Sequence, residues 1–349
     1  MGGSADFCHP HDLGDSWPIS TIDAVGLDPE RLCAVIGWLD ALPGENVHSI
    51  LVVRNGLLAF EHYRGNRDLP QGPDIKHDLR SVTKVVTGLL IGAALAQGYA
   101  LSLDAAIFPY FPEYADLRTP EKDRILLGHV LTMSSGLAWD ENVPISNPAH
   151  GEMRLWQSLD RVRTALEPAC VTPPGAEWNY SGGSTEILGA ILQKATGKPL
   201  DELAREMLLE PLGISDVDWV RHRDGSPSAS GGLYLRSRDL AKIGHLVVKR
   251  GTWCERALIA ADWIRDSISP QIGASDRLFF YGYHWWLGRS LVRRKEVIWA
   301  AGIGLGGQRL FVVPQYDLVV VITAGHYEDG MQAWLPLVIL NRFILPAVT

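Results

Sequence analysis

The spacing of apolar residues changes along the chain, and each change predicts a different element. After Asp28-Pro29, apolar positions recur every three or four residues, which predicts a helix that begins with proline and ends near Pro43-Gly44. Two apolar runs follow, at 49–54 and 57–63, and Asn55-Gly56 between them predicts a tight hairpin. The chain is therefore expected to open with a helix and a pair of strands.

The middle of the chain, from Ser81 to about Leu212, has mostly helical periodicity. The helices expected there span 81–97, 121–133, 151–166, 184–196 and 200–209. After a further helix at 238–249, strands are expected at 281–287, 297–300, 308–313 and 318–323, followed by a last helix at 332–343.

Together these elements predict a mixed α/β fold with an all-helical lobe. The strands from both ends of the chain are expected to pair in one antiparallel sheet flanked by helices, with the middle segment inserted as a helical lobe. We place the sheet lobe at 1–79 plus 232–349 and the helical lobe at 80–231. Because Ser81 falls at the junction, we expect the active site in the cleft between the two lobes.

Composition and charge narrow the possible partners. The 349 residues are 46% hydrophobic and 21% charged, which is ordinary for a globular protein. A net charge of -8, without a long run of Lys and Arg, argues against nucleic acid as a partner. The longest apolar run, 85–96, is too short to cross a bilayer and is broken by Gly88 and Gly92, so no membrane partner is expected. The sequence does not indicate an oligomeric state.

The N-terminus and the cysteines indicate where in the cell the protein is expected. Residues 1–20 have no basic segment followed by an apolar core, so no signal peptide is predicted. The four cysteines are scattered and form no Cys-x-x-Cys, which favours free thiols in a reducing cytoplasm over a zinc site or a disulfide network; they are Cys8, Cys33, Cys170 and Cys254. The histidines are dispersed as well, and no metal or cofactor is expected.

Candidate chemistry begins with Ser81-Val82-Thr83-Lys84, the only Ser-x-x-Lys in the chain. A helix that begins at Ser81 has the hydroxyl in its first turn, where free N–H groups favour a developing anion. Lys84 lies on the same helix face and can take the hydroxyl proton if it is neutral, and the apolar residues that follow it are expected to lower its pKa by desolvation. The alternative is that Ser81 is only a helix cap.

Two glycine-rich stretches carry the other candidates. In 175–184, Tyr180 precedes a predicted helix, and its phenolate can accept a proton and later return it to a leaving group. In 299–308, glycines at the end of a strand expose backbone N–H groups, one of which can pair with the N–H of Ser81 to hold an oxyanion. The alternatives are a loop aromatic in the first stretch and a tight hairpin turn in the second.

The order and spacing of these three stretches resemble the serine β-lactamase and penicillin-recognising superfamily. The closer resemblance is to its class C-like branch, which includes esterases and 6-aminohexanoate-dimer hydrolases. Supporting stretches are 129–137, 231–234 and 281–287, and the resemblance extends from about Val47 to Gly325. It implies a β-lactamase/transpeptidase-like fold.

The resemblance also implies roles for individual residues. Ser81 is the acylated nucleophile, Lys84 its activating partner, and Tyr180 the acid and base that serves the leaving group. The oxyanion lies between the N–H of Ser81 and an N–H near Ile303, with Gly304 as the alternative. Neighbouring positions in the same stretches are further candidates for substrate binding: Gly302, Trp178 and Ser181.

Two departures from the family pattern bear on the substrate. The β-lactamases and peptidases usually carry Tyr-x-Asn, and then Lys or His before Thr-Gly, where this chain has Tyr180-Ser181-Gly182 and Ala301-Gly302-Ile303. The amide and the cation that steady a β-lactam are therefore missing at those positions. A small neutral acyl group needs chiefly the nucleophile, the oxyanion hole and an apolar pocket.

The sequence thus predicts a serine hydrolase that cleaves small carboxylic esters or amides, with 6-aminohexanoate-oligomer-like amides among the candidates. One alternative is a β-lactamase or D-alanyl-D-alanine peptidase, against which the expected lack of a signal peptide argues. A second is a catalytically silent binding protein on the same fold, although Ser81, Lys84 and Tyr180 are all retained.

Overall fold

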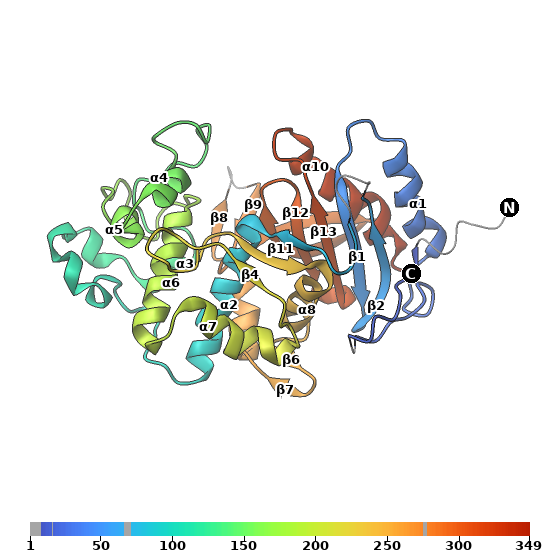
Figure 1. The fold of residues 1–349 in the computed structure, drawn as a ribbon, viewed down its shortest axis with the longest axis horizontal. Helices are drawn as coiled ribbons and strands as arrows, with labels where there is room; N and C mark the ends of the chain where they lie inside the picture. Colours follow the sequence, from blue (N-terminus) through green and yellow to red (C-terminus); the bar gives the residue numbers. More distant parts are fainter. Residues whose placement is uncertain (1–7, 16, 66–70, 275–277) are drawn as a thin grey trace. The chain divides into compact units, whose positions relative to one another are not determined.

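The computed structural model describes residues 8–15, 17–65, 71–274 and 278–349 (Figure 1). The chain forms two compact units. The first comprises Met1–Val82, Tyr234–Lys249 and Gly288–Thr349, and the second comprises Thr83–Leu233 and Arg250–Leu287. Residues 250–287, which the predicted lobes assign to the sheet, thus cluster with the helical segment.

An antiparallel sheet forms the core of the first unit. Its strands there are β1 (Val47–Arg54), β2 (Leu57–Tyr63), β11 (Lys295–Gly304), β12 (Gln308–Val313) and β13 (Leu318–Ala324). They belong to an eight-stranded sheet of order β2-β1-β13-β12-β11-β10-β9-β8. Its other strands are β8 (Ile272–Ala274), β9 (Phe279–Tyr281) and β10 (Trp286–Val292), and β10 continues the chain from the second unit into the first. The predicted fold class is confirmed: the N-terminal strands β1 and β2 and the C-terminal strands belong to one sheet, in which β1 pairs with β13.

Local sequence signals explain the elements of the first unit. Helix α1 (Pro29–Asp40) begins after Asp28, whose carboxylate accepts a hydrogen bond of 3.1 Å from the N–H of Arg31. The hairpin between β1 and β2 turns at Asn55, whose φ of 55° is in the left-handed region that asparagine tolerates. Helix α8 (Ser237–Val248) packs on β12 and β13, and α10 (Met331–Val338) follows the last strand (Figure 1).

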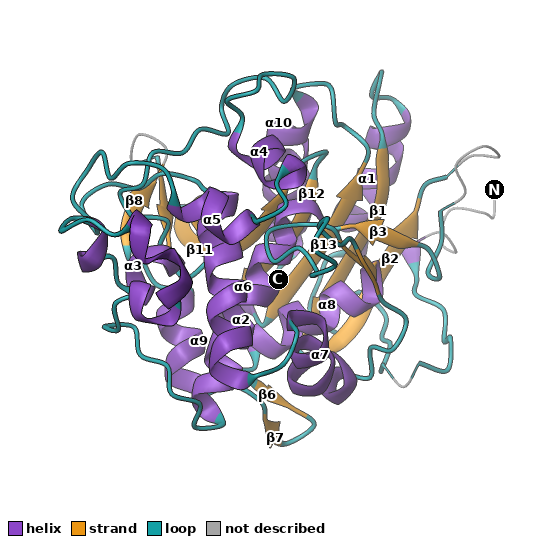
Figure 2. Cartoon of the chain, turned by 60° about the vertical axis from the view of Figure 1, so that its left-hand side comes forward, coloured by secondary structure: helices purple, strands orange, loops and turns teal. Residues whose placement is uncertain are grey.

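The second unit is built around helix α6 (Gly182–Thr196), which is buried from Gly182 to Leu192. It packs beside α2 (Thr83–Ala96), and Figure 2 shows the two helices side by side. Shorter helices complete the unit: α3 (Leu127–Leu131), α4 (Gly151–Gln157), α5 (Arg161–Leu166), α7 (Leu200–Ala204) and α9 (Ala261–Ser267). Of these, α3, α4, α5 and α7 also contact α6.

Some predicted elements are wrong in extent. The helix expected at 151–166 is divided into α4 and α5 at the turn where Asp160 caps α5, accepting a hydrogen bond of 3.0 Å from the N–H of Arg163. The strand expected at 281–287 is instead the end of β9 (Phe279–Tyr281), a turn and the start of β10. A tight turn forms because the N–H of Gly282 donates to the carbonyl of Trp285 at 2.8 Å.

The cysteine prediction is also wrong in part. Cys8 and Cys33 form a disulfide, with their Cα atoms 6.0 Å apart, within the usual span of such a bond. Cys170 and Cys254 are free, as expected. A separation of 25 residues carries no signal of pairing in the sequence, because the folded chain brings the two together. In the described part of the chain, no helix is long and apolar enough to cross a membrane.

Candidate active site

Ser81 lies in the first unit, in a short 3₁₀ turn, Arg80–Val82, that leads directly into α2. The regular helix begins at Thr83 rather than at Ser81 as predicted. Arg80, just before the serine, has a φ of 49°, a left-handed conformation that is costly for this residue type. Asp78 holds it there: its carboxylate accepts the N–H of Arg80 at 2.8 Å and pairs with the guanidinium at 3.0 Å.

The glycine-rich end of β11 packs against this turn. A Cβ at position 304 would lie 2.5 Å from the carbonyl oxygen of Leu79 and 3.1 Å from the Cβ of Arg80, so only glycine fits. Gly302, Ile303 and Gly304 pair with Leu310, Arg309 and Gln308 of β12. The structure therefore brings the turn that carries Ser81 to the strand end predicted to complete the oxyanion hole. The choice between Ile303 and Gly304 stays a prediction.

Lys84 and Tyr180 lie together in the second unit. Lys84 is 4% exposed, and its Nζ donates a hydrogen bond of 2.8 Å to the carbonyl oxygen of Ser230. The same nitrogen lies 5.1 Å from the centre of the Tyr180 ring and is hydrogen-bonded to that side chain. Tyr180 occupies the loop just before α6, as the sequence predicts.

The charge of Lys84 differs from the prediction. Burial lowers the pKa of Lys84, but the charges of Tyr180, Glu141 and Glu152 outweigh it, so the pKa is raised above the ordinary lysine value. The sequence shows the apolar neighbours of Lys84, but not the acidic groups that folding brings to it. Lys84 is accordingly an ammonium in this structure and cannot itself accept a proton from the serine.

The loop around Tyr180 is fastened at several points. Ser181 caps α6, its Oγ accepting the N–H of Ser184 at 3.0 Å, so the hydroxyl is used within the fold. Asn179 donates to the carbonyl of Trp139 at 2.9 Å. One carboxylate oxygen of Glu141, Oε1, accepts the N–H of Gly182 at 2.6 Å and the indole N–H of Trp139 at 2.7 Å. These contacts give the Tyr180 loop a fixed position.

Aromatic side chains surround the tyrosine. The ring of Trp286 lies 5.8 Å from that of Tyr180 and 5.2 Å from that of Trp178, centre to centre. Tyr281 packs against Trp178 at 5.8 Å, and Met133 belongs to the same cluster. Trp178, a predicted substrate-binding residue, is therefore part of an apolar wall next to Tyr180, to which an apolar part of a ligand can bind.

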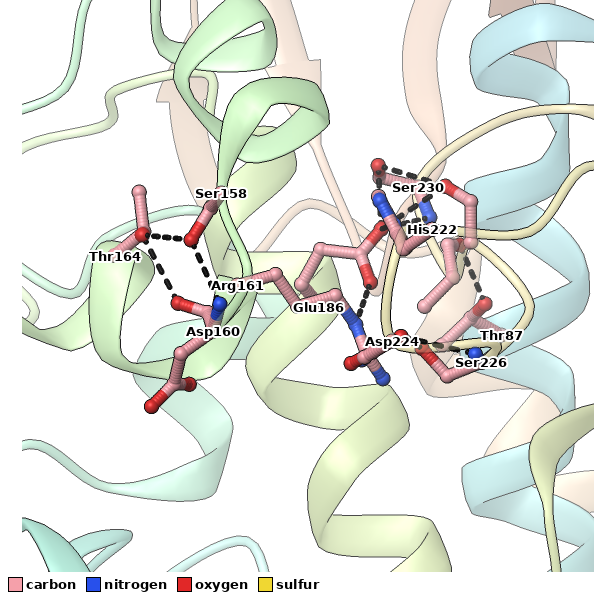
Figure 3. Close-up of polar contacts among 12 residues, drawn as sticks. Thr87, Ser158, Asp160, Arg161, Thr164, Glu186, His222, Asp224, Ser226 and Ser230 are labelled. Carbon is pink, nitrogen blue, oxygen red and sulfur yellow. Dashed lines mark hydrogen bonds and ion pairs between the residues drawn. The ribbon is translucent and has the colours of Figure 1, made fainter.

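The sequence prediction missed a buried carboxylate, Glu186, which binds Ser230, the residue whose carbonyl accepts the hydrogen bond of Lys84; Figure 3 shows Glu186 and Ser230. Glu186 is 0% exposed and accepts the N–H and the hydroxyl of Ser230 at 3.0 and 2.8 Å. Its other oxygen, Oε2, accepts Arg161 Nε at 2.9 Å, whereas His222 Nε2 lies 3.3 Å from Oε1, the oxygen that binds Ser230. Burial raises the pKa of Glu186, but His222, Arg161 and Ser230 outweigh it and hold the pKa at about 2.

This network fixes the acceptor of the Lys84 hydrogen bond, because Glu186 holds the N–H and hydroxyl of the residue whose carbonyl binds Lys84. Ser228 also donates to Glu186, at 3.0 Å, and both Ser228 and Ser230 are buried. A glutamate inside an otherwise apolar helical run is the signal that could have pointed to the network, since a buried charge requires partners.

A neutral histidine also lies near the ammonium. His284 is 2% exposed, and burial together with the charge of Lys84 lowers its pKa to about 3. It therefore adds no charge at neutral pH. Among the residues that the structure describes, no group of three or more His, Cys, Asp and Glu side chains is placed to hold a metal ion.

Comparisons with known proteins show the family of the chain. A family model described as "Beta-lactamase" matches residues 45–334. Esterase EstB of Burkholderia gladioli is 27% identical over 184 residues, 49% of this chain and 46% of the esterase. The 6-aminohexanoate-dimer hydrolase of Paenarthrobacter ureafaciens is 25% identical over 310 residues, 82% of this chain and 74% of the hydrolase.

A solved structure shares the fold. EstCE1, described as a hydrolase with promiscuous acyltransferase activity, superposes with a TM-score of 0.74 at 17% identity, covering 95% of this chain and 100% of EstCE1.

Proposed function

The chain belongs to the beta-lactamase family, and from this premise we propose that it hydrolyses small carboxylic esters or amides through an acyl-enzyme on Ser81. The observation that carries the proposal is the pair of buried Lys84 and half-buried Tyr180, in which a charged amine is hydrogen-bonded to a phenol. An ammonium at this distance favours the phenolate form of a tyrosine. Tyr180 is then the base and Lys84 the group that keeps it ionised.

The proposed reaction begins when Tyr180 takes the proton of the Ser81 hydroxyl and the serine oxygen attacks the substrate carbonyl. The N–H of Ser81, together with the N–H of Ile303 or Gly304, stabilises the oxyanion of the tetrahedral intermediate. Tyr180 returns the proton to the leaving alcohol or amine as the carbonyl–heteroatom bond breaks. Water then attacks the acyl-enzyme by the same route and releases the acid.

The residues present favour small esters or amides over β-lactams. Position 182 is glycine, and Ala301 stands where β-lactamases and peptidases carry a cationic side chain. The chain therefore lacks, at these positions, the amide and the cation expected to hold the carboxylate of a penicillin. The aromatic wall of Trp178 and Trp286 offers no positive charge to such a carboxylate. Both EstB and the 6-aminohexanoate-dimer hydrolase are named for ester or amide substrates.

A labelling experiment tests the nucleophile. The protein and its Ser81→Ala variant are treated with a fluorophosphonate and weighed intact, and both are assayed with p-nitrophenyl acetate and butyrate. We expect one adduct on the unaltered protein, none on Ser81→Ala, and loss of turnover in that variant. Ser102→Ala, at an exposed serine, is the matched control and should behave like the unaltered protein. Equal labelling and equal turnover in both proteins would refute Ser81 as the nucleophile. No adduct and only background turnover in either protein would favour a binding protein.

A further inference from the structure

We propose that Glu141 determines substrate specificity by selecting acyl groups that carry a positive charge and rejecting those that carry a carboxylate. The inference rests on the proposed function, because it assigns a substrate class to the same site. It starts from position 182, where the family pattern has asparagine and this chain has glycine.

The carboxylate of Glu141 lies where a side chain at position 182 would begin. A Cβ at Gly182 would lie 3.0 Å from Glu141 Oε1 and 3.6 Å from both Cβ and Oγ of Ser230. Because position 182 has no side chain, the carboxylate of Glu141 can lie this close to the backbone there. A negatively charged acceptor takes the place of a neutral amide that can both donate and accept.

The carboxylate is held rigidly by one oxygen. Oε1 accepts hydrogen bonds from the N–H of Gly182 and the indole N–H of Trp139, and the Trp139 side chain is itself 8% exposed. A Cβ at Gly183 would lie 2.8 Å from the Trp139 ring, so the indole is packed closely against the start of α6. No described residue donates a hydrogen bond to Oε2. Glu141 is therefore a preorganised acceptor with one oxygen available to a ligand.

Charges around the site favour a cation. Glu141 and Glu152 both act on the buried Lys84, and Tyr180 adds a negative charge when it is a phenolate. Lys84 contributes a single positive charge against the two carboxylates of Glu141 and Glu152. The sum of these three charges is therefore negative even when Tyr180 is protonated. A negative field attracts an ammonium and repels a carboxylate. The faces of Trp178, Tyr180 and Trp286 are a second source of attraction for a cation.

A purely structural role for Glu141 makes a different prediction. In Glu141→Gln the amide oxygen can still accept from Gly182 and Trp139, so the loop keeps its support while the charge is lost. If Glu141 only supports the loop, the variant treats charged and uncharged substrates as the unaltered protein does. If Glu141 selects substrates by charge, the ratio of kcat/KM for charged to uncharged substrates changes in the variant.

The test uses three p-nitrophenyl esters of similar shape. The 4-(trimethylammonio)butanoate and the 5,5-dimethylhexanoate differ in charge but have the same outline, and the hemiglutarate carries a carboxylate. We expect Glu141→Gln to lower the ratio of kcat/KM for the cationic ester to that for the neutral ester by about tenfold, the effect of one well-placed charge pair. The neutral ester is the reference for any effect of the variant on Lys84 and the Tyr180 loop, and the hemiglutarate should improve relative to it. Glu177→Gln, which removes an exposed charge from the same loop, should leave the ratio unchanged.

Failure of the inference is distinct from failure of the proposed function. An unchanged ratio in Glu141→Gln, with the neutral ester still hydrolysed, refutes the role of Glu141 and leaves the hydrolase standing. If no ester is hydrolysed, binding to Ser81→Ala decides, measured by tryptophan fluorescence with 4-(trimethylammonio)butanamide and 5,5-dimethylhexanamide. A preference for the cationic amide that disappears when Glu141→Gln is added supports the inference, and equal binding of both amides overturns it.

Discussion

Replacing Glu186 by glutamine is expected to destabilise the second unit strongly. The carboxylate is fully buried and bound to Arg161, Ser228 and Ser230. A folded pKa of about 2, against 4.5 for an ordinary glutamate, corresponds to about 3 kcal/mol in the free energy of unfolding. The variant also removes one of the two charge partners of the buried Arg161 and leaves only Asp224. Removing a partner from a buried ion pair costs a similar amount, about 3–5 kcal/mol.

The sign of the pH dependence follows from the lowered pKa. A carboxylate with a depressed folded pKa stabilises the protein above its unfolded value of 4.5, and this contribution disappears as the pH falls toward 2. We therefore expect the difference between the unaltered protein and Glu186→Gln to be fully present at pH 7 and to shrink below about pH 4.5. Activity should fall as well, because Glu186 positions the Ser230 carbonyl that binds Lys84.

The assay is urea unfolding of both proteins at pH 7 and at pH 3.5, followed by circular dichroism. Glu206→Gln is the matched control, because this glutamate forms an exposed ion pair with Lys198 and should contribute less than about 1 kcal/mol. A Glu186→Gln protein within about 0.5 kcal/mol of the unaltered one at pH 7 would contradict the reasoning. So would a difference that grows as the pH falls.

Three further predictions concern the catalytic groups. Gly304→Ala should reduce the free energy of unfolding by about 2 kcal/mol and kcat by more than tenfold, because the new methyl group would press on the carbonyl of Leu79. Thermal unfolding and steady-state kinetics check this, and wild-type values in both would disprove the close approach of position 304 to Leu79. Tyr180→Phe should lower kcat about a thousandfold, whereas Tyr110→Phe, at a half-buried tyrosine, should not. An active Tyr180→Phe enzyme would exclude the tyrosine as base. Since the pKa of Lys84 is raised above 10.5, its ammonium persists up to and beyond that pH. The value of kcat/KM, corrected for background hydrolysis, should therefore show no alkaline loss below about pH 10. A loss centred between pH 7 and 9, and absent from Lys84→Met, would show that Lys84 titrates there.

Features set by neighbours in sequence were predictable. Asn55-Gly56 determines the hairpin and Asp28 the start of α1, because both act within a few residues of chain. The order of Ser81, Lys84, Tyr180 and the glycines near 304 was likewise enough to indicate the family, which the match over residues 45–334 confirms.

Features set by distant residues were not predictable. The pKa of Lys84 depends on Glu141, Glu152 and Tyr180, which are separated from it by long stretches of chain, so its apolar sequence neighbours gave the wrong direction. The network around Glu186 was missed for the same reason, because Arg161 and Ser230 are distant from it in the sequence and contact it only after folding. Burial alone can be estimated from a sequence pattern, but the partners of a buried charge cannot.

The hydrogen bond from Lys84 to Ser230 has a consequence for synthesis on the ribosome. The two residues are 146 positions apart, so at about 5–20 residues per second the lysine emerges roughly 7–30 s before its acceptor exists. During that interval α2 contains a cation that cannot be buried in its final place. A nascent chain that ends before Ser230 should therefore keep this helix accessible to protease or chaperone, whereas a chain that has passed Ser230 can close over it.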